Sequence, residues 1–448
     1  MGDLNKPNPK IKSGKGIYLI TEDNRKILDA SSGAAVSCIG HGDKRVIKVI
    51  NIQHKTGASY VCSTFWTNIV TDELCEYIII STNGKMIRVF LINSGSEGIE
   101  TAIKLARYYY FEKNKNSKRI NIIAREGSYH GNTFGALSVS GHFYRREPYT
   151  PLLLKNVHFI SSCYPYRQRK ENETDAQFLL RKKIELEEKI LELGPETVMA
   201  FIMEPVVGAA LGCVTPVPGY LKAVREVCDK YDIILIFDEV MCGSGRTGYL
   251  HAWQAENVAP DIQIMAKGLA GGYAPISAVL ASEKVVNTIA KGSGEFVHGH
   301  TYEGMPTTTV AALEVLRIIQ KDKLLKNVSK QGTYLKKRLE VALKNHPNVG
   351  DIRGQGLFLG IELVENKITK KPFDPKLSVS QKIVDLALSP EFNMTIYRGA
   401  NYVEGVRIEF IMLAPPLIIK KKEIDIIVNT VSTIIHRICE DVNSKKRK

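Results

Sequence analysis

The chain has 448 residues, enough for a large hydrophobic core and for two domains. A hydrophobic content of 44% and a charged content of 24% are typical of a globular protein, and no long apolar run predicts a membrane span. The formal net charge is +14, but basic residues are mixed with 47 acidic ones along the chain, so we do not expect nucleic acid as a partner.

The cysteines and the N-terminus give two further expectations. Eight cysteines are scattered from Cys38 to Cys439 without the paired spacing of a metal site, which predicts reduced thiols, no metal and a cytoplasmic location. Residues 1–13 have neither the apolar segment of a secretory signal nor the arginine- and serine-rich composition of a presequence.

The N-terminal part begins with short strands and helices. Residues 14–29 predict a small β-meander and residues 44–56 a helix. Residues 61–66 end in Phe65 and Trp66, just before a helix that begins near Asn68. Residues 88–92 predict a strand, and the sequence that follows, Ser94-Gly95-Ser96-Glu97, fits a capping box at the start of a helix. Free backbone N–H groups at such a helix start are suited to bind phosphate.

Three further strands are predicted, each followed by polar residues. Residues 119–124 precede Tyr129-His130-Gly131, residues 198–203 precede Glu204, and residues 233–237 precede Asp238. Runs without polar alternation suit parallel strands that are covered on both faces, and ligands bind beyond the carboxyl ends of such strands. Between them we expect loops over residues 143–149 and 164–173 and helices over 177–193 and 219–231.

A fourth apolar run, residues 262–266, leads directly into Lys267 and then Gly268. A lysine in an apolar pocket becomes a nucleophilic amine that can form a Schiff base with a carbonyl group. Pyridoxal phosphate needs such a lysine, together with a carboxylate against its ring nitrogen. Asp238 is the candidate for that carboxylate, although either residue alone would more often be an ordinary surface or capping group.

The whole block from Asp238-Glu239-Val240 through Gly245-Arg246-Thr247-Gly248 to Ala266-Lys267-Gly268 resembles the signature of the class III (ω-) aminotransferases, pyridoxal-phosphate-dependent enzymes of fold type I. The resemblance covers roughly residues 15–435. It implies an α/β fold with a mostly parallel central sheet flanked by helices, and a smaller α+β domain. The expected division is an N-terminal arm at 1–55, a large cofactor-binding domain at 56–306 and a C-terminal small domain at 307–448.

The resemblance also implies roles for individual residues. Lys267 would form the Schiff base and Asp238 would hold the pyridinium nitrogen. The cofactor-binding set would comprise these two residues with Val240, Gly95, Ser96, Tyr129, His130 and, from the other subunit of a homodimer, Thr301. Substrate contacts would come from Glu204, Trp66 and an arginine near Pro415-Pro416. Arg398 and Arg407 compete for that last role, and Arg398 is preferred.

The function implied is the transfer of an amino group from an amino acid or ω-amine donor to a keto acid, by a ping-pong mechanism with shared sites in a homodimer. The same scaffold also serves pyridoxal-phosphate-dependent lyases and decarboxylases, and an inactive relative acting as an interaction protein is a third possibility. The sequence leaves the donor and the acceptor open.

Overall fold

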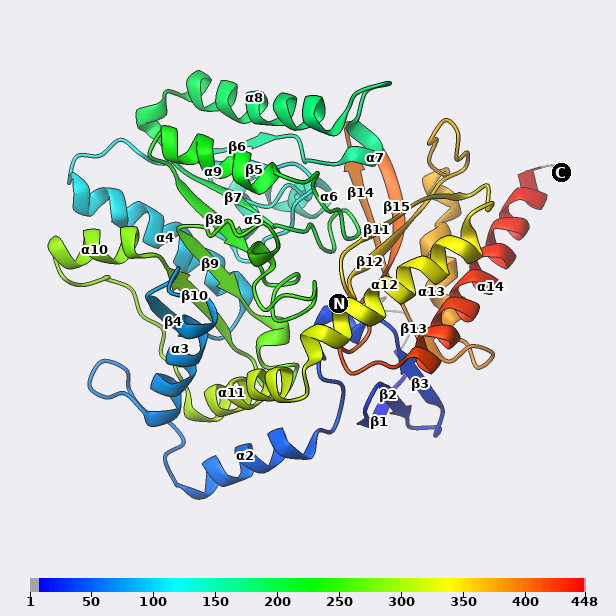
Figure 1. Cartoon of the computed structure of the whole chain (residues 1–448), viewed down its shortest axis with the longest axis horizontal. Helices are drawn as coiled ribbons and strands as arrows, with labels where there is room; N and C mark the ends of the chain where they lie inside the picture. Colours follow the sequence, from blue (N-terminus) through cyan, green and yellow to red (C-terminus); the bar gives the residue numbers. More distant parts are fainter. Residues whose placement is uncertain (1–7, 447–448) are drawn as a thin grey trace.

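A large sheet occupies the centre of the computed structural model, which describes residues 8–446 (Figure 1). It has seven strands in the order β4-β10-β9-β8-β7-β5-β6, and only β10 is antiparallel to its neighbours. The bounds are β4 Arg88–Ile92, β5 Asn121–Arg125, β6 Val157–Ile160, β7 Val198–Met203, β8 Ile234–Asp238, β9 Ile262–Met265 and β10 Ser277–Ala281. The predicted, mostly parallel sheet is confirmed. The five strands predicted from the sequence start within two residues of their predicted positions, whereas β6 and β10 were not predicted.

Helices cover both faces of this sheet, which explains why β7 and β8 contain no alternation of polar residues. On one face, Ile202, Ile236 and Ile264 pack with α4 (Gly95–Lys113) and α10 (Glu283–Lys291). On the other face, Phe201 and Phe237 pack with α8 (Asp175–Leu193) and α9 (Tyr220–Lys230). The core around this sheet therefore lies in two layers, and two further apolar clusters lie outside them, one of which includes residues of α11, α12 and α14.

The helices near β4 come from the N-terminal part and from the middle of the chain. α2 (Lys44–Lys55) and α3 (Ile69–Ser81) pack against α11 (Pro306–Lys321). The short helices are α1 Ser32–Ala35, α5 Phe134–Ser138, α6 Phe143–Arg146 and α7 Pro165–Gln168, with 3₁₀ turns at Glu147–Leu152, Pro195–Thr197, Ala252–Ala255, Lys267–Leu269 and Pro375–Leu377. The loops predicted over 143–149 and 164–173 are therefore wrong in part: a single helical turn shows no apolar periodicity by which a sequence could reveal it.

Two four-stranded sheets form the smaller region. One joins the N-terminal meander to a late strand, in the order β1-β2-β3-β13, and the other has the order β11-β12-β15-β14. Their bounds are β1 Ile11–Lys15, β2 Tyr18–Thr21, β3 Lys26–Asp29, β11 Val349–Gly354, β12 Leu359–Leu363, β13 Met394–Thr395, β14 Tyr397–Val403 and β15 Val406–Leu413. The helices of this region are α12 Leu324–Leu343, α13 Val379–Leu388 and α14 Lys421–Lys446. The domain boundaries after residues 55 and 306 stay predictions.

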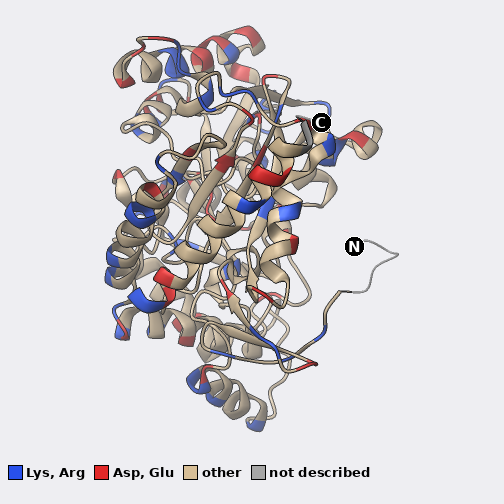
Figure 2. Cartoon of the chain, turned by 90° about the vertical axis from the view of Figure 1, so that its right-hand side faces the viewer, with Lys and Arg blue, Asp and Glu red and all other residues tan. Residues whose placement is uncertain are grey.

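The charged residues do not gather by sign. In the view of Figure 2, lysines and arginines are spread over several helices and interleave with acidic residues. Over the described part of the chain, no helix is both long and apolar enough to cross a membrane.

Candidate active site

A cavity of about 300 Å³ lies beyond the carboxyl ends of β7, β8 and β9, where ligands bind in α/β sheets. Side chains from several separate segments of the chain meet there. The lining residues are Val36, Asn93, Ser94, Gly95, Ser96, Tyr129, His130, Gly131, Glu204, Ala209, Asp238, Val240, Met241, Ala266, Lys267, Ala274, Pro275 and Ile276. The set includes eight of the eleven residues that the sequence predicts for the site.

Lys267 stands two residues after the end of β9, in an unusual backbone conformation. Its φ is 45°, in the left-handed region that costs a non-glycine residue about 1 kcal/mol or more. Burial lowers the pKa of its amine, whereas the carboxylates of Asp238 and Glu204 raise it. Within the described residues, Nζ has no hydrogen bond or ion pair, so the amine remains available to a ligand.

Asp238 is the last residue of β8 and is only 3% exposed. Its Oδ1 accepts a hydrogen bond from the backbone N–H of Val240 at 2.9 Å, and its Oδ2 lies 2.8 Å from Nδ1 of His130. The two contacts fix the orientation of the carboxylate. The other ring nitrogen of His130, Nε2, is buried and has no partner among residues 8–446, so it is free to interact with a bound group.

Tyr129 and Glu204 are coupled through the backbone. Oε1 of Glu204 accepts from the N–H of Tyr129 at 3.1 Å, and Oε2 accepts from Gly208 at 2.8 Å. Burial raises the pKa of the Glu204 carboxyl, with Asp238 adding to the effect and His130 opposing it. Burial also raises the pKa of the Tyr129 phenol. Glu204 therefore anchors the turn that presents the Tyr129 ring to the cavity.

The start of α4 closes another side of the cavity. Oγ of Ser94 caps the N–H of Glu97 at 3.3 Å, while the Glu97 carboxylate accepts from Asn93 at 3.1 Å. The predicted capping box is thus half formed, because the glutamate reaches one residue beyond the N-cap. The N–H groups of Gly95 and Ser96 belong to the first turn, where a helix has no partner for them. This arrangement suits an anion.

Close packing explains the two glycines beside this helix start. A Cβ on Gly95 would lie 3.0 Å from both methyl groups of Val240. A Cβ on Gly131, which has a φ of +143°, would lie 2.6 Å from Oγ of Ser96. That hydroxyl accepts from the N–H of Asn132 at 3.0 Å. The Tyr129 turn and the start of α4 therefore form two adjoining walls of the cavity.

Three predicted residues do not line the cavity of this chain. Trp66 is 71% exposed, and Thr301 is also exposed on its loop. Arg398 is exposed on β14, an edge strand, and is paired with Ile411 of β15. Arg407, the alternative, lies near Glu409 with 3.6 Å between Nη2 and Oε1. Thr301, which is expected to act from a second subunit, is thus on the surface, as is Trp66, and the choice between the two arginines stays open.

The cavity fits a flat, anionic cofactor that carries a carbonyl group. An unpaired amine, a buried carboxylate held by an imidazole, an aromatic ring and a helix start converge on it. A family model described as "Aminotransferase class-III" matches residues 3–435. The chain belongs to the class III aminotransferases.

Individual relatives agree with this assignment. An aminotransferase of Gibberella zeae is 43% identical over 96% of this chain and 84% of its own length. A taurine–pyruvate aminotransferase of Bilophila wadsworthia is 38% identical over 80% of this chain and 78% of its own. The ω-transaminase of Pseudomonas jessenii, solved in complex with PMP, has a TM-score of 0.90 at 32% identity, covering 97% of this chain and 94% of that one.

This class III aminotransferase is therefore a pyridoxal-phosphate-dependent transaminase of fold type I, which moves an amino group between an amine and a keto acid. The sequence missed some of its surroundings. Met241, Ala274 and Ile276 line the cavity but are ordinary core types that no motif distinguishes. It also missed Arg145, whose guanidinium lies over the ring of Tyr129, because that residue falls in a stretch predicted as a loop.

Proposed function

We propose that Lys267 is the residue that holds the cofactor covalently and that Asp238 binds the nitrogen of its ring. The observation that carries this proposal is the unpaired Lys267 amine at the end of β9, in the same cavity as the Asp238 carboxylate. A strained backbone at a residue whose amine faces a ligand cavity is the usual mark of a functional position.

The other lining residues complete the proposed site. The first turn of α4, at Gly95 and Ser96, binds the phosphate, while Tyr129 and Val240 lie on the two faces of the ring. His130 holds Asp238 in place. When bound, the cofactor withdraws electrons from the carbon that loses a proton. Lys267, freed by the incoming amine, moves that proton, for which an amine with a lowered pKa is suited near neutral pH.

Borohydride reduction tests the assignment directly. The purified protein should be yellow, and reduction should fix the cofactor to the peptide that contains Lys267. Label on any other lysine would contradict the proposal. A panel of amine donors, with cofactor absorbance monitored in the half-reaction, would then identify the substrate. Analysis for a keto product without loss of CO₂ distinguishes transamination from decarboxylation.

We further propose that the active unit is a homodimer with shared sites. An exposed apolar surface supports it, formed by two segments that lie side by side: the rings of Tyr60 and Tyr302 are 6.0 Å apart. The backbone oxygen of Gly304 accepts from Asn68 and Thr71 at 3.0 and 2.9 Å. The exposed residues are Tyr60, Phe65, Trp66, Ile69, Val297 and Tyr302. An apolar surface of this kind favours burial against a second copy.

Complementation between inactive variants tests shared sites. Lys267→Ala is mixed, under subunit exchange, with Thr301→Ala combined with Trp66→Ala. If Thr301 serves the partner's cofactor and Trp66 the partner's substrate pocket, one site of each mixed dimer is intact and activity returns. The matched control mixes Lys267→Ala with a variant that carries all three substitutions, Lys267→Ala, Thr301→Ala and Trp66→Ala. No site of that mixed dimer has the lysine, so no activity should return. A dead mixture with confirmed exchange would exclude sharing.

Two expectations from the sequence remain untested. The eight cysteines are all free thiols in the structure, and we keep the cytoplasm as the proposed location. The absence of a nucleic-acid partner also stays a prediction. Weak binding that falls with salt and ignores base sequence is the expected result.

A further inference from the structure

A positively charged side chain lies against Tyr129, one of the residues that line the cavity, although it is not itself a lining residue. Arg145, in α6, places its guanidinium carbon 5.0 Å from the centroid of the Tyr129 ring. α6 packs against β14, the strand that carries Arg398 (Figure 1). Arg145 is therefore held at the junction of the large sheet's strand ends and the smaller region, next to a ring that lines the cavity.

The charge of Arg145 is not neutralised within the described residues. It makes no ion pair and no hydrogen bond to a carboxylate there, and its side chain is exposed. The two titratable neighbours that it affects are neutral at pH 7. Burial lowers the pKa of His142 to about 4, with Arg145 adding to the effect, and burial raises the pKa of Tyr129 above its ordinary value.

The adjacent arginine on the same helix shows a different arrangement. Arg146 is half-buried, donates to the backbone oxygen of Ser140 at 3.0 Å, and lies over the Phe159 ring at 4.6 Å. It therefore has a packing role. Arg145 lies over the ring of Tyr129 in a cation–π contact, and its guanidinium also hydrogen-bonds the Tyr129 phenol, which opposes the effect of burial on the pKa of that hydroxyl. A guanidinium has five N–H donors, so the others remain for a ligand.

Resting on the proposed function, we propose that Arg145 binds the carboxylate of the amino donor and so favours amino acids over neutral amines. The planar guanidinium offers two parallel N–H groups that match the two oxygens of a carboxylate. The carboxylates inside the cavity, Asp238 and Glu204, are already held by His130 and by backbone N–H groups. Arg145 is thus free for an anion that enters with the substrate.

Paired donors test this inference. β-Alanine carries a carboxylate, and propylamine has the same chain length without it. Arg145→Gln should raise the KM for β-alanine roughly 10-fold or more, as expected for loss of a charge-assisted hydrogen bond. It should leave kcat for β-alanine, and the KM for propylamine, within about 2-fold. Arg145→Lys should restore part of the loss. An equal rise of both KM values would overturn the inference.

A binding measurement separates this inference from the proposed function. Propionate has no amine and cannot react, so its affinity for the cofactor-loaded enzyme can be followed by the cofactor spectrum. Arg145→Gln should weaken propionate binding roughly 10-fold, whereas Lys155→Gln, which removes an exposed charge away from the cavity lining, should not. Unchanged binding in Arg145→Gln, or loss in Arg398→Gln alone, would overturn the inference. If propionate binding depends on Arg145 but the enzyme turns over no amine donor, the inference about Arg145 stands and only the proposed function is refuted.

Discussion

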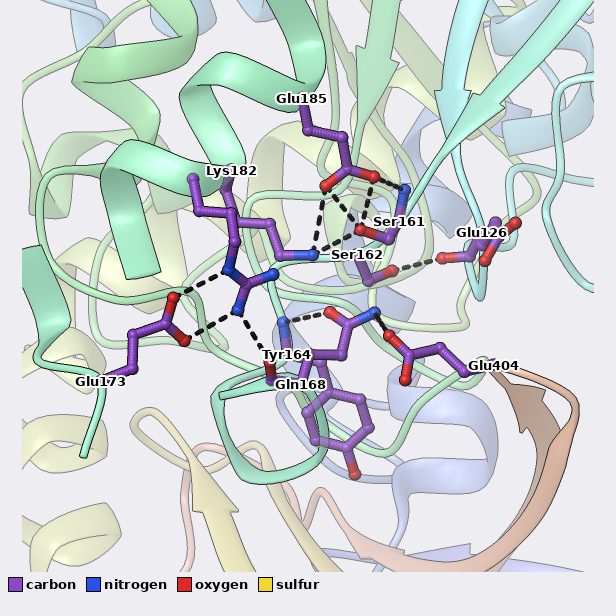
Figure 3. Close-up of polar contacts among 10 residues, drawn as sticks. Glu126, Ser161, Ser162, Tyr164, Gln168, Glu173, Lys182, Glu185 and Glu404 are labelled. Atoms are coloured by element: carbon purple, nitrogen blue, oxygen red, sulfur yellow. Dashed lines mark hydrogen bonds and ion pairs between the residues drawn. The ribbon is translucent and has the colours of Figure 1, made fainter. Parts of the chain in front are cut away.

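Two lysines of this protein lie near glutamates, Lys182 buried and Lys267 partly buried, and desolvation lowers the pKa of both. Lys267 lies at the cavity and has no partner among the described residues. Lys182, in α8, points toward Ser161 and Glu185 in the polar cluster of Figure 3. Its Nζ is 3.3 Å from Oε2 of Glu185 and also donates to the Ser161 hydroxyl.

The surroundings of the two lysines differ in what they leave open. Lys182, Glu185 and Ser161 belong to the polar cluster of Figure 3, called here the cluster under α8. In it, the Glu185 carboxylate accepts hydrogen bonds from both the N–H and the hydroxyl of Ser161, at 2.7 and 2.6 Å. Nearby, Gln168 donates to Glu404 at 3.1 Å and ties the β14–β15 turn to this region (Figure 3). In the cavity, Lys267, His130 and Gly95 all present unused hydrogen-bonding groups. A shifted pKa alone would not have separated the catalytic lysine from the structural one.

The largest predicted effect is on turnover, and it should be seen when Lys267 is replaced but not when Lys182 is. Lys267→Met should reduce turnover by at least about 10³-fold, since both covalent attachment and proton transfer are lost. Stopped-flow measurement of the half-reaction with the best donor provides the comparison. Lys182→Met is the matched control and should keep turnover within about 2-fold. A large loss of turnover in Lys182→Met, with the fold intact, would remove the distinction.

The two carboxylates provide the next test. Asp238→Asn should retain the cofactor but lower kcat by roughly 10²- to 10³-fold. The variant lacks the preorganised carboxylate that stabilises the charge developing in the transition state. Glu185→Gln, in the cluster under α8, should not change kcat measurably. Both values come from the same steady-state assay, with cofactor content checked by absorbance. A near-normal kcat in Asp238→Asn would mean that Asp238 only supports the structure.

Much of this architecture could be predicted because the strands are buried on both faces. The uninterrupted apolar runs of β7 and β8 located Glu204 and Asp238 at the sheet edge, and the family signature located Lys267. The smaller region was harder. The stretch 399–405, which separates the two candidate arginines, is part of a hairpin whose turn residues Glu404 and Gly405 both have positive φ, at 49° and 77°.

That hairpin also explains why the substrate arginine could not be chosen. Side chains of a strand alternate between faces, so the position of Arg398 depends on the register with β15. Tyr397 packs in the same apolar cluster as Tyr129, which places the neighbouring Arg398 on the opposite face. Register is set by turn geometry and by contacts distant in sequence, such as the one between Gln168 and Glu404. Neither is visible in local composition.

The cluster under α8 should affect stability rather than turnover. Lys182→Met removes a buried ammonium and leaves Glu185 and the Ser161 hydroxyl without one partner. The expected loss is about 1–3 kcal/mol, because unpaired polar groups keep their desolvation cost. A lower melting temperature at unchanged kcat would confirm it. Lys189→Met, which breaks a more exposed pair with Glu192 on the same helix, should cost less than about 1 kcal/mol.

The smallest effect concerns Glu126, which follows β5 and lies half-buried in the same cluster (Figure 3). Burial raises the pKa of its carboxyl, Glu185 and Glu404 raise it further, and Lys182 opposes them. A raised pKa in the folded state means that folding favours the protonated form. Ionised Glu126 therefore reduces stability at neutral pH, and the reduction disappears as the pH falls toward the unfolded-state value.

Glu126→Gln should consequently stabilise the protein slightly at pH 7. We expect less than about 1 kcal/mol after allowing for solvent screening of a half-buried group. Melting curves of the variant and the parent at pH 7.5, 6 and 5 would show a difference that shrinks toward pH 5. A variant that is less stable than the parent at pH 7.5 would mean that the ionised carboxylate is stabilised in the fold. The attraction of Lys182 for the Glu126 carboxylate would then outweigh burial and the repulsion by Glu185 and Glu404.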